Sequence, residues 1–153
     1  MEFNYAKINE KIRKLIDLRL NKGVQPSELM ENINNEEYSK VYARKIFGET
    51  HCTVGFTDYG IFDNIKSKYE YIYRYDNNMC LKEIIMKKNK LDTIIWNRQN
   101  EEIKILNEII MELRNNSKTI EINKLIENLP NDLCEKFKER FELIEKSKDR
   151  KLV

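Results

Sequence analysis

Apolar residues recur at helical spacing near the start of the chain. Over residues 7–20, isoleucines and leucines three and four positions apart are separated by lysine, arginine and acidic side chains. This spacing places the apolar residues on one face of a helix and the charges on the other. Gly23 follows, and it suits the position just beyond a helix C-terminus. The sequence therefore predicts an amphipathic helix over residues 7–20.

Two further short helices are predicted before residue 50. Pro26 suits the first turn of a helix, because the N–H that proline lacks has no partner there. Leu29 begins the short apolar face of this helix. A third helix is expected over residues 36–47 (EEYSKVYARKIF), and Gly48 would close it.

The middle of the chain carries a mixed pattern. The segment HCTVGF (51–56) is a strand candidate, and tyrosines alternate with other residues from Tyr69 to Tyr75. Alternation with a period of two favours a strand, whereas the residues around it favour a helix. We expect a helix through 60–75, and a small β-hairpin near 50–75 is the alternative.

A strong helical pattern follows. Apolar residues lie three and four positions apart through residues 81–115. The polar stretch WNRQNEE (96–102) weakens the pattern, so that one long helix and two shorter helices are both open. Pro130 then divides two further helices, over 119–129 and 131–146. The chain is expected to be mainly α, with a three-helix N-terminal unit followed by a C-terminal bundle of long helices.

The predicted elements group into three parts and a tail. They are a three-helix unit over 1–49, an aromatic connecting segment over 50–80, a helical assembly domain over 81–147 and a frayed tail over 148–153. A helix of about 35 residues spans about 50 Å, which is more than a small domain needs for its own core. Such helices often pack on a copy of themselves, so a homodimer is expected.

Composition narrows the class of protein. The formal net charge is +2, which gives no bulk attraction for nucleic acid. The three cysteines are far apart and form no C-x-x-C pair, which indicates reduced thiols and no disulfide framework. No run approaches the roughly 18 apolar residues of a membrane span, and no signal-peptide core is present at the start. We expect a cytoplasmic protein.

No group of residues in the sequence suggests catalysis. His51 is the only histidine, and its neighbour Cys52 is expected to point away from it, since adjacent side chains seldom face each other. The acidic residues are scattered and lack the spacing of metal ligands. No glycine-rich phosphate loop or nucleophile motif occurs. We therefore expect no enzyme, no cofactor and no metal.

The N-terminal elements follow the order of a helix-turn-helix domain. The opening FNYAKINEKIRKL and the segment YARKIFGE (42–49) resemble phage-type Cro/repressor proteins of the xenobiotic-response-element class. Tyr42 and Ile46 correspond to core positions of the recognition helix in that family, and Gly48 corresponds to its end. The resemblance implies a small dimeric DNA-binding transcriptional regulator of a phage or another mobile element.

The resemblance also implies which residues contact operator DNA. In that family a glutamine at the start of the second helix braces phosphate, and Gln25 stands at that position. The outer face of the predicted helix 36–47 would enter the major groove, where Arg44 could bond guanine or phosphate. The predicted DNA-binding residues are Gln25, Ser39, Lys40, Arg44 and Lys45.

A second class of function is open: a protein–protein inhibitor or adaptor that acts without DNA, such as a phage-encoded blocker of a host defence complex. Glu36 and Glu37 favour it, because carboxylates at the start of a recognition helix would be repelled by phosphate. Tyrosine is also enriched at protein interfaces. The predicted partner interface, for a second copy or a host protein, comprises Tyr69, Tyr71, Tyr73, Leu91, Ile95, Leu106 and Ile110.

Overall fold

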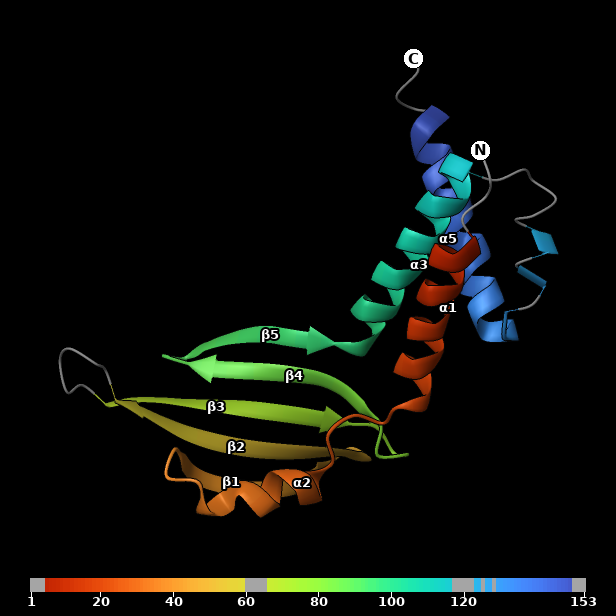
Figure 1. Ribbon diagram of the computed structural model, residues 1–153. Coiled ribbons are helices and arrows are strands. Elements are labelled where there is room, and N and C mark those ends of the chain that lie inside the picture. Colours follow the sequence, from red (N-terminus) through yellow and green to blue (C-terminus); the bar gives the residue numbers. More distant parts are fainter. Residues whose placement is uncertain (1–4, 60–65, 117–122, 125, 128, 150–153) are drawn as a thin grey trace. The chain divides into compact units, whose positions relative to one another are not determined.

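The chain contains a five-stranded antiparallel sheet with the strand order β1-β2-β3-β4-β5 (Figure 1). The computed structural model describes residues 5–59, 66–116, 123–124, 126–127 and 129–149. Each strand pairs with the next one along the sequence, so the sheet is a meander. This is an α/β fold, and the predicted mainly α fold is wrong.

Helices precede and follow the sheet. The elements before it are α1 (Tyr5–Leu20), α2 (Pro26–Glu31) and the short 3₁₀ turn η1 (Asn32–Asn34). The strands are β1 (Tyr38–Ile46), β2 (Glu49–Tyr59), β3 (Lys66–Tyr75), β4 (Leu81–Lys88) and β5 (Leu91–Asn97). The helices after it are α3 (Arg98–Asn116) and α5 (Asn131–Asp149). The helices predicted over 7–20 and 131–146 are confirmed, and none of the described helices is long and apolar enough to cross a membrane.

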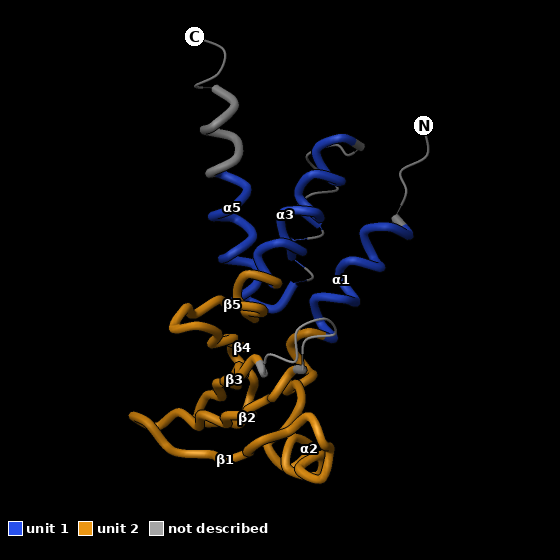
Figure 2. Tube along the Cα trace, turned by 90° about the vertical axis from the view of Figure 1, so that its left-hand side faces the viewer, with its two compact units in different colours: residues 1–17, 102–153 blue, residues 18–101 orange. Residues whose placement is uncertain are grey.

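The chain divides into two compact units, which Figure 2 colours separately. The helical unit, residues 1–17 and 102–153, holds most of α1 and α3 together with α5. Its core consists of Ile8, Leu15, Leu106, Ile109, Ile110, Leu113, Leu133 and Phe137. The sheet unit, residues 18–101, holds α2 and all five strands. Its core consists of Leu29, Cys52, Val54, Tyr75 and Leu81. Each unit therefore has an apolar core of its own.

In the sheet unit, α2 packs on one face of the sheet (Figure 1). Leu29 of α2 is buried in the same cluster as Val54 of β2. The Tyr75 hydroxyl donates a hydrogen bond to the carbonyl oxygen of Val24, at 2.6 Å. Burial raises the pKa of Tyr75, which keeps this hydroxyl a neutral donor. These contacts attach the segment that carries α2 to the third strand.

The predicted helix over 36–47 is wrong, because residues 38–46 form β1. The two residues after β1, Phe47 and Gly48, both have positive φ, at 49° and 81°. A two-residue hairpin turn of type I′ requires this backbone at both positions. Phe47 and Gly48 therefore form the hairpin turn that joins β1 to β2. A glycine with positive φ serves a helix end and such a turn equally well, and this explains the wrong interpretation.

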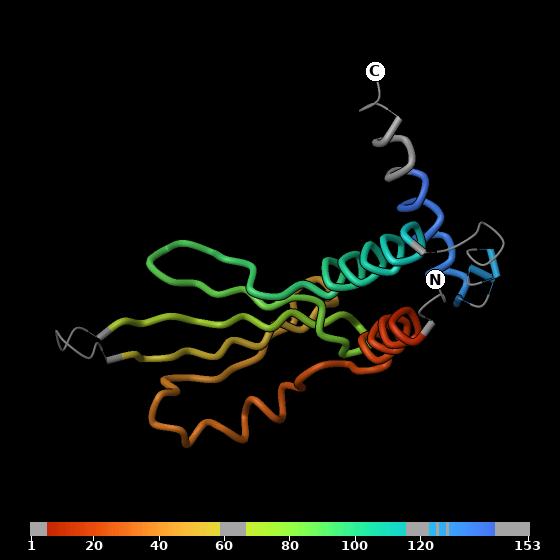
Figure 3. The backbone as a smooth tube through the Cα atoms, turned by 45° about the horizontal axis from the view of Figure 1, so that its top comes forward, coloured from red at the N-terminus to blue at the C-terminus, as the bar shows by residue number. Residues whose placement is uncertain are grey.

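The predicted helical stretch over 81–115 is also wrong in its first half. Residues 81–97 form the β4–β5 hairpin, drawn in green in Figure 3, and only 98–116 are helical. The turn consists of Asn89 and Lys90, with φ of 53° and 63°. Ile84 and Ile85 point to opposite faces of β4, and both are partly buried. A strand that is buried on both faces has apolar residues at neighbouring positions of the sequence, and this pattern resembles the apolar spacing of a helix.

The alternative proposed for the middle of the chain is the one that the structure has. Residues 51–56 lie in β2, and the alternating tyrosines lie in β3, which pairs with β2 in antiparallel register from Thr50–Tyr75 to Tyr59–Lys66. The helix expected over 60–75 is therefore wrong from residue 66 onward. Residues 60–65 of that prediction, 150–153 of the predicted tail, and 119–122, 125 and 128 of the helix predicted over 119–129 lie outside the described residues.

Candidate binding face of the sheet

The sheet has two chemically different faces. Cys52 and Val54 of β2 point into the core with α2, and this side is called the α2 face. Because side chains alternate along a strand, Thr53 points to the opposite face. Residues directly paired in an antiparallel sheet share a face, so the register identifies the residues that accompany Thr53.

A row of five side chains crosses all five strands on this opposite face. Successive pairs in the register join one residue of each strand. The row, called the central row below, consists of Tyr42, Thr53, Ile72, Ile85 and Ile94. Tyr42 and Ile94, at its ends, are 41% and 58% exposed, whereas Thr53 is 2% exposed. Strands lie about 4.8 Å apart, so the row extends about 19 Å across the sheet.

A rim of paired charges lies on one side of the central row. The register places Lys40, Gly55, Glu70, Lys87 and Asp92 next to one another across the strands. Lys40 forms an ion pair with Glu70, and Lys87 Nζ lies 3.6 Å from Asp92 Oδ2. The first pair joins β1 to β3 across β2, where Gly55 has no side chain in the way. A Cβ at Gly55 would lie 2.8 Å from Lys40 Cγ and 2.7 Å from Ser39 Oγ, which is too close.

The opposite rim is a network of ion pairs around Arg74. The guanidinium donates to Glu83 Oε2 at 2.7 Å and to Glu49 Oε2 at 3.0 Å. Glu49 also accepts from Lys82 Nζ at 2.5 Å, and His51 Nε2 lies 3.3 Å from it. Both carboxylates are thus held by cations, and this rim, like the first, presents charges of both signs.

The network predicts a pH dependence of stability. Hydrogen bonds from Lys82 and Arg74 lower the pKa of Glu49 from 4.5 to about 2. A carboxylate with a depressed pKa stabilises the fold above its unfolded pKa and loses this contribution as pH falls through its folded pKa. We expect the free energy of unfolding to drop by about 1–2 kcal/mol from this group between pH 4.5 and 2. Chemical denaturation across this range measures it, and Glu49→Gln should reduce the slope. A Glu49→Gln profile as steep as that of the wild type would contradict the assignment.

Of the five residues predicted to bind DNA, four lie on β1 and Gln25 lies just before α2. Gln25 precedes α2, and its Nε2 donates to the carbonyl oxygens of Gly23 and Met79, at 3.0 and 3.2 Å. Ser39 and Lys40 lean over Gly55 on the face of the central row. Arg44, paired in register with His51, points to the same face as Lys40, whereas Lys45, paired with Thr50, points to the α2 face. The structure thus brings Lys40 and Arg44 to one face of a strand, where the sequence predicted a helix.

The predicted partner residues also separate. Leu106 and Ile110 are fully buried in the core of the helical unit. Tyr73 packs against the core of the sheet unit. Leu91 and Ile95 are exposed on β5. Of this set, the residues on β5 present the most open apolar surface.

Tyr69 and Tyr71 belong to an aromatic cluster on the α2 face. The Phe56 ring stacks on Tyr69 with centroids 5.2 Å apart, and it meets Tyr38 and Tyr71 edge to face at 4.7 and 5.3 Å. Such aromatic pairs between neighbouring strands stabilise the sheet. The alternating tyrosines are therefore explained by the packing of β3 against its neighbours.

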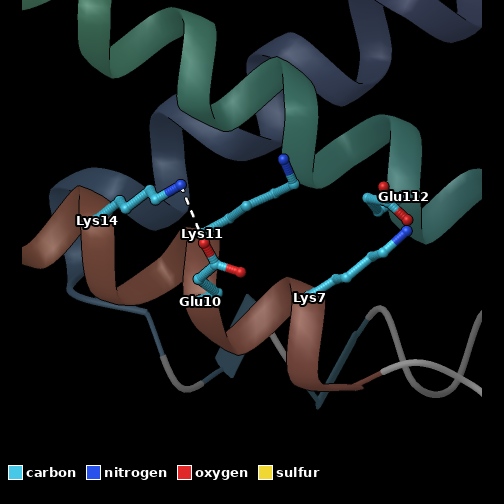
Figure 4. Close-up of a pocket in the computed structure, with 5 residues that line it drawn as sticks. All are labelled: Lys7, Glu10, Lys11, Lys14 and Glu112. Atoms are coloured by element: carbon cyan, nitrogen blue, oxygen red, sulfur yellow. Dashed lines mark ion pairs between the residues drawn. The ribbon is translucent and has the colours of Figure 1, made fainter.

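Metal-ligating side chains do not gather in the part of the chain that the structure describes: no group of three or more histidine, cysteine or acidic residues there could hold a metal ion. His51 and Cys52 lie on opposite faces of β2, and burial raises the pKa of the Cys52 thiol. The hollow in Figure 4, on α1 and α3, is lined by Lys7, Glu10, Lys11, Lys14 and Glu112. Lys14 pairs with Glu10 there, Lys7 extends toward Glu112, and Lys11 pairs with Glu108 outside the lining, so each lysine of the hollow faces a carboxylate.

None of the five residues of the central row is among the site residues predicted from the sequence. The resemblance places Tyr42 in the core of a recognition helix, and the apolar spacing predicts Ile85 and Ile94 on one face of a helix. The available signal was the alternation in β3 together with the turn at Gly48. In comparisons with known proteins, no family model, no curated protein and no solved structure matches the chain significantly.

Proposed function

We propose that the chain is a protein-binding module, an inhibitor or adaptor, that holds an amphipathic helix of a partner protein against the central row. The carrying observation is the row itself: one residue from each strand, apolar at four of five positions, with a rim of paired charges on either side. Protein interfaces have this composition, with an apolar centre and a polar rim.

The dimensions of the row fit a helix. An α-helix has a pitch of 5.4 Å, close to the strand spacing of about 4.8 Å, so that its turns can meet the exposed Tyr42 and Ile94 and the half-buried isoleucines of the row. About 13 residues of helix span the 19 Å of the row. A narrow apolar stripe with charges on both flanks matches a helix with apolar residues at i, i+4, i+7 and i+11.

The charges of the rims favour a protein over a nucleic acid as the partner. Each rim carries acidic residues beside its lysines and arginines, and Glu49, Glu70 and Glu83 already hold the nearest cations. DNA binding requires a net positive surface, because phosphate contacts supply most of the affinity. Operator binding therefore stays a prediction that no observation here favours.

A displayed library of helical peptides tests the proposal. Peptides selected on the wild-type chain should carry apolar residues at the spacing above, and Tyr42→Asp should weaken their binding at least about tenfold, or 1.4 kcal/mol. Tyr42 is exposed, so the variant should keep its fold. Met111→Asp, which also replaces an exposed apolar side chain with aspartate but on α3, is the control and should bind like the wild type.

Two results would overturn the proposal. One is a set of selected peptides without the helical spacing, or with binding that Tyr42→Asp leaves unchanged. The other is salt-dependent binding of the DNA upstream of the coding region, lost in Arg44→Ala and Lys40→Ala; this result would support the regulator instead.

A further inference from the structure

The fifth strand leaves one edge of the sheet unpaired. β5 pairs with β4 alone, and β4 and β5 form the outer hairpin in Figure 3. Alternate N–H and C=O groups of an edge strand point away from its neighbour and can accept another strand. The side chains at this edge are also apolar and open: Leu91 is 68% exposed, and Ile94 and Ile95 are about half exposed.

The two edge strands of the sheet, β1 and β5, differ in the features that prevent pairing with another chain. β1 carries Lys40, Arg44 and Lys45, and a bulge interrupts its register between Tyr38 and Lys40. Charged residues and bulges are the usual means of preventing a strand from pairing with another chain. β5 has the sequence LDTIIWN, with neither lysine nor proline and with Asp92 as its one charge. Its bulge, at Ile95, leaves Leu91–Ile94 in regular register with β4.

We propose that β5 pairs in antiparallel orientation with β5 of a second copy, so that two chains form a continuous ten-stranded sheet. The charges of the two edge strands favour pairing through β5 and disfavour pairing through β1. A two-fold pairing centred on Thr93 or Ile94 sets Asp92 opposite an uncharged residue of the other copy. The same pairing of β1 centred on Tyr42 sets Lys40 opposite Arg44, and like charges directly opposite destabilise a sheet.

The symmetry of this dimer has a consequence for the central row. A two-fold axis between antiparallel edge strands stands perpendicular to the sheet, so each face of one sheet continues into the same face of the other. The two central rows then lie on one surface, and a partner with two helices would gain from binding both. The pairing itself rests on the β5 edge alone and does not depend on the function proposed for the row.

Sedimentation equilibrium of the full chain tests the pairing. The wild type should show a concentration-dependent change from the 18.5 kDa monomer to the dimer. Leu91→Lys/Ile95→Lys should raise the dimer dissociation constant at least about tenfold. Both side chains are exposed, so circular dichroism should show an unchanged fold. The matched control is Leu20→Lys/Met111→Lys, which makes the same change at exposed positions of α1 and α3 and should dimerise like the wild type.

Three outcomes would overturn the pairing. They are a wild type that stays monomeric at all accessible concentrations, a β5 variant that dimerises normally, and a control variant that loses the dimer. The last outcome would assign the dimer to the helices. Because the β5 variant keeps Tyr42, it should still bind the selected helical peptides, so the failure of either proposal can be recognised separately.

Discussion

Replacing Phe137 with alanine is expected to lower the free energy of unfolding of the helical unit by about 3–4 kcal/mol. Phe137 of α5 is fully buried in a cluster with Leu106 and Ile110 of α3, and its ring stacks on Phe141 with centroids 6.1 Å apart. Alanine would remove most of these contacts and leave a cavity that the surrounding helices fill only in part. Chemical denaturation followed by circular dichroism at the helical band measures the loss.

The control for this prediction lies on α3 of the same unit. Met111 is exposed, so Met111→Ala should change the free energy of unfolding by less than about 0.5 kcal/mol. Trp96, the only tryptophan, packs against the core of the sheet unit, and its fluorescence reports on that unit separately. A loss below about 1 kcal/mol in Phe137→Ala would show that α5 does not pack as described.

The sequence was sufficient to predict the helices that bury one face. Over residues 7–20 and 131–146, apolar residues lie on one side only, and Pro26 and Pro130 mark helix starts through their own geometry. These signals are local, because a helix bonds its backbone within itself and its pattern needs no information about a neighbour.

The sequence did not predict β1, β4 and β5 as strands, and the physical reason differs between the β1–β2 hairpin and the β4–β5 hairpin. In β1, a glycine turn followed a segment with apolar residues four apart, and such a segment suits a helix as well as a strand. In β4 and β5, adjacent apolar residues serve both faces of the sheet, and the turn at Asn89–Lys90 contains no glycine to mark it. In both hairpins, tertiary packing outweighs the structure that the local sequence pattern favours.

The candidate site could not be predicted from the sequence for a further reason. The central row exists only because five strands align Tyr42, Thr53, Ile72, Ile85 and Ile94 in one register. Register depends on turn geometry and bulges at several places along the chain, and an error of one residue moves every side chain to the other face. Leu91 and Ile95 of β5, by contrast, are among the partner residues predicted from the sequence, and the structure leaves both side chains exposed.

Replacing Arg74 with methionine is expected to lower the free energy of unfolding of the sheet unit by about 2–3 kcal/mol at neutral pH. Arg74 connects Glu83 on β4 with Glu49 at the start of β2, and Glu83 is 9% exposed. Methionine keeps the aliphatic length but leaves the nearly buried carboxylate without its cation. Breaking such a pair costs more than forming it contributes, because one charge stays desolvated. Denaturation followed by Trp96 fluorescence measures the effect.

Three comparisons separate this electrostatic role from simple packing. Arg74→Lys should lose less than Arg74→Met, because lysine restores the charge but cannot reach two carboxylates with one planar group. Adding Glu83→Gln to Arg74→Met should recover at least about 1 kcal/mol, since the uncompensated charge is then removed. The deficit of Arg74→Met should also shrink as pH falls from 4.5 toward 2, where Glu49 gains its proton and loses its attraction for the guanidinium. A deficit that is independent of pH and unaffected by Glu83→Gln would mean that Arg74 stabilises the sheet through its aliphatic stem.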